Sequence, residues 1–278
     1  MRIIVTSPTY IQNTIPTNHI DDFKNFLMVK NDLDKDEADL LVKEGMDCFG
    51  QGGFASGNFG NFSEFYSKIF SWKHSPIEDV YHNTYQFHSP IDFLRMLSYP
   101  TYSSLRDLEL YSQIVEYLIE IYNKDNEEIV VVDYGAGLAQ ITITLSKLLK
   151  KNNIDCKLVF VDIERYIYRE FLEFIENEYK LNFEFIDIND KNPYPEIPKF
   201  NFIQIKDVFE HVYCPENIVD NIECSIKENG MISATTDDEG PEMMHVSRDL
   251  KEVRDKIEKC GFKVLGNSWF NRGYIYQK

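Results

Sequence analysis

The sequence has no long apolar run and is short of basic side chains. It contains 29 Lys and Arg against 46 Asp and Glu, so its formal net charge is −17. A membrane-spanning helix needs about 20 apolar residues in succession, and no segment approaches that length. The apolar stretch at residues 1–5 is too short for a secretory signal, so we expect a cytoplasmic protein without a membrane partner. The shortage of Lys and Arg argues against broad binding to DNA or RNA, whose phosphates these side chains neutralise.

Cysteine is also scarce, and its spacing excludes a disulfide framework or a paired zinc site. The five cysteines are odd in number and form no C-x-x-C pair; they are Cys48, Cys156, Cys214, Cys224 and Cys260. We expect reduced thiols, as is usual in the cytoplasm. The histidines at 74, 82 and 88 lack the i,i+4 spacing of helical metal ligands. We therefore expect no metal.

The first 104 residues differ from the rest and are expected to form a mainly helical cap. Helices are predicted at residues 21–29 and 35–49, with Asp34 as the N-cap of the second. The glycine- and phenylalanine-rich stretch at residues 50–62 is either a flexible surface loop or a lid over a substrate. An aromatic segment follows, in which Tyr81 and Tyr85 are expected to line a small-molecule pocket.

Residues 129–146, IVVVDYGAGLAQITITLS, combine a buried strand, a glycine turn and the start of a helix. Gly135 and Gly137 allow a tight turn in which the backbone can approach a ligand closely. Such a strand–turn–helix unit is a cradle of the nucleotide-binding type. A dinucleotide fingerprint needs a third small residue at position 140, where this chain has Gln140. The pattern is instead D-x-G-x-G, with Asp133 two residues before the first glycine.

From residue 105 onward, predicted strands and helices alternate. Besides the strand at 129–132, strands are predicted at residues 157–161, 182–186, 200–206, 230–236, 262–265 and 272–277. This alternation predicts an α/β fold: a Rossmann-like, doubly wound, seven-stranded and mostly parallel sheet. The loop before the last strand is too short for a crossover helix, so that strand should be antiparallel. Four acids follow strands at the edge where such sheets bind ligands: Asp133, Asp162, Asp187 and Asp207.

Two segments carry a family resemblance. The sequence DYGAG resembles motif I of the class I S-adenosylmethionine-dependent methyltransferases, [DE]-x-G-x-G-x-G, with Ala139 in place of the last glycine. Residues 206–236 begin KDVFEHV and are similar to the ubiquinone-biosynthesis O-methyltransferases and their small-molecule relatives. His245-Val-Ser and the Cys260-Gly-Phe turn match the closing pattern of that group. The resemblance covers residues 105–278, which we expect to form the methyltransferase domain.

The resemblance implies S-adenosylmethionine as the cofactor and S-adenosylhomocysteine as its product. Asp162 would accept hydrogen bonds from both ribose hydroxyls, with Ile163 packed on the adenine. Asp187 would receive the adenine amino group, and the Ile188 backbone N–H a ring nitrogen. The rest of the implied cofactor site is the glycine turn and two acids, namely Asp133, Gly135, Ala136, Gly137 and Asp207.

His211 is the candidate catalytic base, because a neutral imidazole near the methyl group can take a proton from an attacking hydroxyl or amine. Glu210 would orient it or act itself; alternatively, both residues only form the first turn of a helix. His245 would join Tyr81 and Tyr85 at the acceptor. The expected reaction is methyl transfer to an O or N atom of a small metabolite, with sugars and sugar nucleotides among the acceptors.

Two other functions stay open. Asp207, Glu210, His211 and His245 resemble the metal-binding set of small-RNA 3′-terminal 2′-O-methyltransferases. That family has Glu where this chain has Asp207, and a second nearby histidine where this chain has Val212-Tyr213. The other alternative is a non-catalytic module that binds S-adenosylmethionine for regulation.

Overall fold

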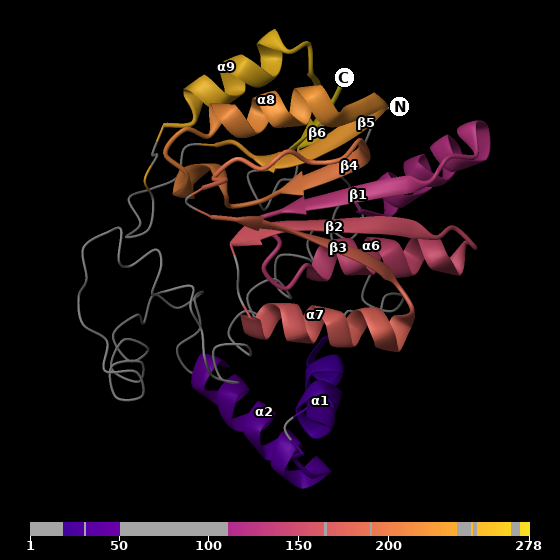
Figure 1. Ribbon diagram of the computed structural model, residues 1–278, viewed down its shortest axis with the longest axis vertical. Helices are drawn as coiled ribbons and strands as arrows, with labels where there is room; N and C mark the ends of the chain where they lie inside the picture. The colour runs from indigo at the N-terminus through magenta and orange to yellow at the C-terminus, as the bar shows by residue number, and fades with distance from the viewer. Residues whose placement is uncertain are drawn as a thin grey trace. The chain divides into compact units, whose positions relative to one another are not determined.

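The computed structural model describes residues 19–30, 32–50, 111–163, 166–189, 191–237, 246, 249–267 and 273–278. Its centre is a seven-stranded sheet with the order β3-β2-β1-β4-β5-β7-β6 (Figure 1). The strands are β1 (Ile129–Tyr134), β2 (Cys156–Ile163), β3 (Asn182–Ile188), β4 (Phe200–Ile205), β5 (Ile226–Thr235), β6 (Lys263–Asn267) and β7 (Gly273–Gln277).

The first five strands are parallel, and β7 runs antiparallel to both β5 and β6. This confirms the predicted fold class, including the antiparallel last strand. The helices that accompany the sheet are α6 (Gln140–Lys151), α7 (Tyr166–Tyr179), the 3-10 turn η3 (Phe209–His211), α8 (Glu216–Ser225) and α9 (Lys251–Lys259). Residues 111–125 form a further helix before β1.

One boundary differs from the prediction. The fifth strand was expected to begin at Gly230 after a polar turn, but β5 begins at Ile226. Its pairing with β4 is irregular, because Phe200 faces Ile226 while Phe202 faces Met231. Asn229 takes a left-handed φ of 61° in this stretch. The polar turn is thus a bulge inside the strand rather than a loop before it.

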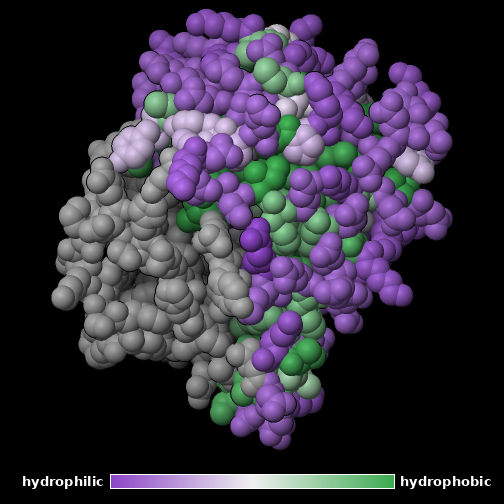
Figure 2. Space-filling model, viewed as in Figure 1, coloured by the Kyte–Doolittle hydropathy of each residue, from purple (hydrophilic) through white to green (hydrophobic). Residues whose placement is uncertain are grey.

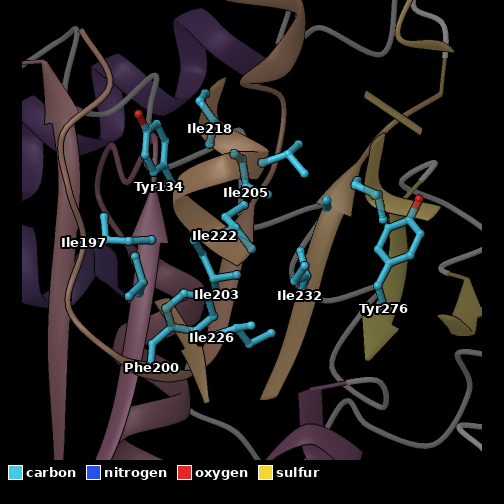
Figure 3. Close-up of a cluster of buried hydrophobic side chains, with 14 of the residues drawn as sticks. Tyr134, Ile197, Phe200, Ile203, Ile205, Ile218, Ile222, Ile226, Ile232 and Tyr276 are labelled. Atoms are coloured by element: carbon cyan, nitrogen blue, oxygen red, sulfur yellow. The ribbon is translucent and has the colours of Figure 1, made fainter. Parts of the chain in front are cut away.

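One face of the sheet carries the apolar core beneath α8 and α9. Val132, Ile203 and Ile232 are fully buried on β1, β4 and β5. Figure 3 shows strand side chains gathered against Ile218 and Ile222 of α8. Burial of this stripe is what holds the helix layer on the sheet. The outer surface over α8 and α9 is mostly hydrophilic (Figure 2).

The opposite face of the sheet is polar near the carboxyl ends of the central strands. Asp133 on β1, Gln204 on β4 and Ser233 on β5 are neighbours in register, and all three are buried. Side chains alternate between faces along a strand, so these three share one face. Hydrogen bonds join Gln204 to Tyr111 of the helix at residues 111–125 and Asp133 to α6. The polar groups therefore lie between the sheet and two helices.

Contacts along the chain divide it into two units. Among the described residues, one unit contains 19–30, 32–50 and 166–174, and the other contains the rest. In the first, α1 (His19–Lys30) and α2 (Lys35–Gly50) agree with the predicted helices. Asp34 is the predicted N-cap: its carboxylate accepts the Glu37 N–H, and the Glu37 carboxylate accepts the Asp34 N–H, both at 2.9 Å.

The first unit is held by aromatic contacts on the first half of α7. Phe26 packs edge-on against Phe171 at 5.6 Å and against Phe174 at 5.8 Å between ring centroids. Phe23 and Phe171 are each at most 1% exposed. Most of the predicted cap, from residue 51 to residue 110, lies outside the described residues, as does the region before residue 19. None of the helices in the described part of the chain is long and apolar enough to cross a bilayer.

Candidate cofactor and active site

The glycine turn after β1 is tied to the end of β2. Gly135 N–H donates to the Val161 carbonyl at 2.7 Å, and Gly137 N–H donates to Asp162 Oδ2 at 2.6 Å. Both glycines have positive φ, 73° and 50°, which residues with a side chain rarely adopt. The structure therefore brings the turn and Asp162 together, as expected for residues at the carboxyl ends of neighbouring parallel strands.

Gly135 is also required by close packing against the segment after β4. A Cβ added to Gly135 would lie 2.3 Å from Val208 Cγ2. The D-x-G-x-G turn and the DVFEHV run, which are 70 residues apart, are thus in direct contact. Val208 was not among the predicted site residues, and only knowledge of the strand order would have placed it here.

Ala139 occupies the position of the last glycine in the family motif, and its backbone has a conformation that favours glycine. Ala139 has φ 49° and ψ 29°, a left-handed conformation, and immediately precedes α6. Its N–H donates to the Ala136 carbonyl at 2.6 Å, which closes the turn. For a residue with a Cβ this conformation costs about 1–2 kcal/mol. The turn therefore accepts backbone strain at the third position of the motif.

Asp162 and Asp187 lie side by side on β2 and β3. They are direct partners in the parallel register, as are Ile163 and Ile188 one residue later. All four are half-buried. Asp162 Oδ1 also accepts the Ile163 N–H at 2.7 Å, so both of its oxygens are oriented by backbone donors. A carboxylate oxygen can accept a second hydrogen bond, which leaves Asp162 able to bind ligand hydroxyls.

Asp133 is buried beneath the turn. Thr142 Oγ1, on the first turn of α6, donates to Asp133 Oδ2 at 2.6 Å. Burial raises the pKa of Asp133 to about 7, against the lowering effect of the Thr142 hydrogen bond; the Asp162 charge adds to the increase, and a Gln204 hydrogen bond opposes it. Asp133 thus holds a proton in the native state up to about neutral pH.

Asp133 is linked through Gln204 to a tyrosine on the helix at residues 111–125. Tyr111 donates its hydroxyl to Gln204 Oε1 at 2.8 Å, and both side chains are buried. Tyr111, Thr142 and Gln204 were missed by sequence reasoning. The one available signal was a glutamine inside the otherwise mostly apolar strand FNFIQI.

The segment after β4 holds the predicted catalytic pair. Asp207 is exposed and has a left-handed φ of 53°. Glu210 is 1% exposed, whereas His211 is half-buried. Glu210 Oε1 lies 4.0 Å from His211 Nε2, which is beyond hydrogen-bond distance. Both residues belong to the short turn η3 and precede α8, which starts at Glu216.

Three of the predicted site residues belong to the part of the sequence that the structure does not describe. Tyr81, Tyr85 and His245 lie outside the described residues. Val246, next to His245, donates its backbone N–H to the Glu210 carbonyl at 2.8 Å. Within the described ranges, no group of three or more His, Cys, Asp or Glu side chains is arranged to hold a metal ion.

Comparison with known proteins gives a fold match only. No protein-family model matches the sequence, and no curated protein matches it. Among solved structures, the CMeT domain of the citrinin polyketide synthase matches with a TM-score of 0.51 at 13% identity, covering 91% of this chain and 68% of that one.

Two further solved structures match less of the chain. Precorrin-6y C5,15-methyltransferase from Geobacter metallireducens GS-15 matches with a TM-score of 0.35 at 17% identity over 50% of this chain. The CurJ carbon methyltransferase matches with a TM-score of 0.43 at 11% identity over 63% of this chain. The match spans 65% and 55% of the lengths of these two proteins. This chain shares a Rossmann-like fold with the citrinin CMeT domain, whose match has the highest TM-score of the three.

Proposed function

We propose that this chain is an S-adenosylmethionine-dependent methyltransferase that acts on an O or N atom of a small metabolite. The observation that carries the proposal is the contact of three elements at one edge of the sheet. The glycine turn donates a backbone hydrogen bond to Asp162, packs against Val208, and lies beside the buried Asp133. These are the segments in which the family resemblance is concentrated.

The described residues fit an adenosine-containing cofactor. Asp162 and Asp187 present adjacent carboxylates from β2 and β3, suited to the ribose hydroxyls and the adenine amino group. Ile163 and Ile188 supply apolar surface for the adenine, and the Ile188 N–H can serve a ring nitrogen. A turn without side chains at Gly135 and Gly137 leaves room for the methionine end, with Ala136 between them.

The same edge can hold the acceptor. When bound, S-adenosylmethionine supplies an electrophilic methyl group on a sulfonium. His211 would take the proton from the acceptor hydroxyl or amine, as a neutral imidazole can near pH 7. At 4.0 Å, Glu210 would act on His211 through its charge and not through a direct hydrogen bond. Asp207, exposed at the start of this segment, would lie at the cofactor, with Tyr81, Tyr85 and His245 at the acceptor.

Sugars and sugar nucleotides are the acceptors we would test first. Within this proposal, residues 1–104 form a cap that shapes the acceptor pocket, and residues 105–278 form the catalytic domain. Phe23 and Phe26 pack on α7, so a deletion of the first 60 residues would expose apolar surface. Substitutions at Tyr81 and Tyr85 are therefore the better test of the cap.

Cofactor binding is tested by calorimetry with S-adenosylhomocysteine and with NAD. We expect S-adenosylhomocysteine to bind and to stabilise the protein by about 2.7 kcal/mol at a hundredfold excess over Kd. Asp162→Asn keeps an acceptor for the Gly137 N–H but loses the charge, so affinity should fall at least roughly tenfold. Asp155→Ala, at the opposite end of β2 with a 91% exposed side chain, is the matched control. Binding of NAD without S-adenosylhomocysteine would refute the proposal.

Turnover is tested on metabolite pools and on RNA, with and without a chelator. We expect methylation of a small molecule that a chelator does not affect. His211→Gln should lower that turnover by roughly 100- to 10,000-fold while S-adenosylhomocysteine affinity stays at the wild-type value. Chelator-sensitive methylation of RNA would favour the RNA enzyme, and cofactor binding without any turnover would favour the regulatory module.

A further inference from the structure

A chain of buried polar side chains crosses the sheet face beneath the glycine turn. It runs from Tyr111 through Gln204 to Asp133, and from Asp133 to Thr142 on α6. None of the four side chains is more than 6% exposed. These hydrogen-bonded side chains therefore connect the helix at residues 111–125 to the start of α6, across the buried face of the sheet beside Asp133.

The direction of these hydrogen bonds follows from what each group can donate. A glutamine amide has one accepting oxygen and one NH₂ group. Because Gln204 Oε1 accepts the Tyr111 hydroxyl at 2.8 Å, the NH₂ group is the part left to donate to Asp133. A reversed amide would instead turn its oxygen toward the carboxylate. Tyr111 therefore acts on Asp133 by fixing the orientation of Gln204.

We propose, on the basis of the function proposed above, that Tyr111 and Gln204 are positioning residues that hold the Asp133 carboxylate beneath the glycine turn for the positively charged methionine end of the cofactor. Seating of the helix at residues 111–125 is thereby coupled to charge recognition in the cofactor site. A helix that shifts away removes the Tyr111 hydroxyl, frees the Gln204 amide to reverse, and weakens the hold on Asp133.

The groups around Asp133 determine the pH at which its charge is present. Burial raises its pKa to about 7, Thr142 from α6 and Gln204 from β4 lower it, and Asp162 from β2 raises it. Loss of the Gln204 hydrogen bond should therefore move the titration of Asp133 to higher pH. S-adenosylmethionine carries a sulfonium charge that S-adenosylhomocysteine lacks, so its binding should depend more strongly on the Asp133 charge.

The first experiment uses the unliganded full chain. The free energy of unfolding is measured from about pH 5 to about pH 9 for the wild type, Tyr111→Phe and Gln204→Met. Stability falls as pH rises toward the native pKa of Asp133 and levels off above it. We expect the pH at which it levels off to rise by about one unit in Gln204→Met and by about half a unit in Tyr111→Phe. Tyr117→Phe is the matched control: it removes a hydroxyl from the same helix, one that donates to the Asn229 carbonyl at 3.0 Å. In this control, stability should level off at the same pH as in the wild type.

The second experiment measures binding of both ligands by calorimetry at about pH 6 in every variant. This pH lies below the raised pKa of Asp133, about 7, so a higher pKa lowers the charged fraction, and use of a single pH makes titration of the ligand cancel between variants. We expect the ratio of S-adenosylmethionine to S-adenosylhomocysteine affinity to fall about three- to tenfold in Tyr111→Phe and Gln204→Met. In Tyr117→Phe it should not change.

Three results would overturn the positioning role. The first is that both test variants show the wild-type levelling-off pH and the wild-type affinity ratio. The second is that Tyr117→Phe shifts these two quantities as much as the test variants do. If no variant and not even the wild type binds either ligand, the proposed function itself fails, and the positioning role falls with it.

Discussion

The contact between Gly135 and Val208 gives a prediction whose magnitude can be worked out from two separate terms. In Gly135→Ala the alanine would have to keep the φ of 73° that Gly135 has, and its Cβ would lie 2.3 Å from Val208 Cγ2. The left-handed backbone costs about 1–2 kcal/mol for alanine, and overpacking adds about 1–3 kcal/mol. With Val208→Ala in place, the nearest remaining atom is the Cβ of residue 208 at 3.6 Å, an ordinary contact. Only the backbone term should then remain.

The assay is urea unfolding of the wild type, both single variants and the double variant. We expect a favourable coupling of about 1–3 kcal/mol between the two substitutions, equal to the relieved overpacking. Gly261→Ala provides the backbone term alone, because Gly261 has φ 84° and no atom within 4 Å of an added Cβ. A coupling within about 0.5 kcal/mol of zero would show that Val208 does not pack on the turn, and the argument for a joint site would fail.

Three further predictions concern the same sheet. Ala139→Gly should be more stable than the control Ala136→Gly by about 1–2 kcal/mol, because both lose a buried methyl group but only the first relieves a left-handed residue; equal unfolding midpoints in urea would contradict this. The raised pKa of Asp133, about 7, means that stability is lost as pH rises from about 4 to about 7, by up to about 1.4 kcal/mol per pH unit, and Asp133→Asn should flatten that slope in the same assay. Asn201→Leu should cost about 1–3 kcal/mol in thermal unfolding, because Asn201 Oδ1 accepts the buried Val130 N–H at 2.9 Å; an unchanged Tm would contradict it.

The fold could be predicted because its signals are local. Apolar strands alternate with amphipathic helices from residue 129 onward, and that alternation alone implies a parallel sheet. The short connection before β7 indicated its antiparallel direction. Asp34 was placed as an N-cap from the acidic residues that follow it, and the reciprocal hydrogen bonds with Glu37 agree.

The hydrogen-bond partners around Asp133 could not be predicted, because their positions depend on strand order and register. Gln204 comes beside Asp133 only because β4 is the neighbour of β1. Tyr111 reaches Gln204 across 93 residues of sequence, and no spacing rule connects the two. The bulge at Asn229 was missed for a similar reason: a polar turn sequence suggests a loop, but pairing with β4 kept it within the strand.

Backbone strain gives an argument for the proposed ligand site that does not depend on the family resemblance. Among the described residues, most non-glycine positions with left-handed φ are Asn, Asp or Lys. Asp32, Asn126, Asn153 and Lys180 lie at turns and helix ends, where such conformations are common, and Asn229 lies in the bulge of β5. Ala139 has no polar side chain to favour the conformation, and Asp207 adopts it directly after β4. The loops that contain these two residues meet where Val208 packs on Gly135. Strain that the surrounding structure must support concentrates at functional sites. The strained residues lie at the carboxyl ends of β1 and β4, close to the buried Asp133. This position supports the proposed ligand site on grounds separate from the family resemblance.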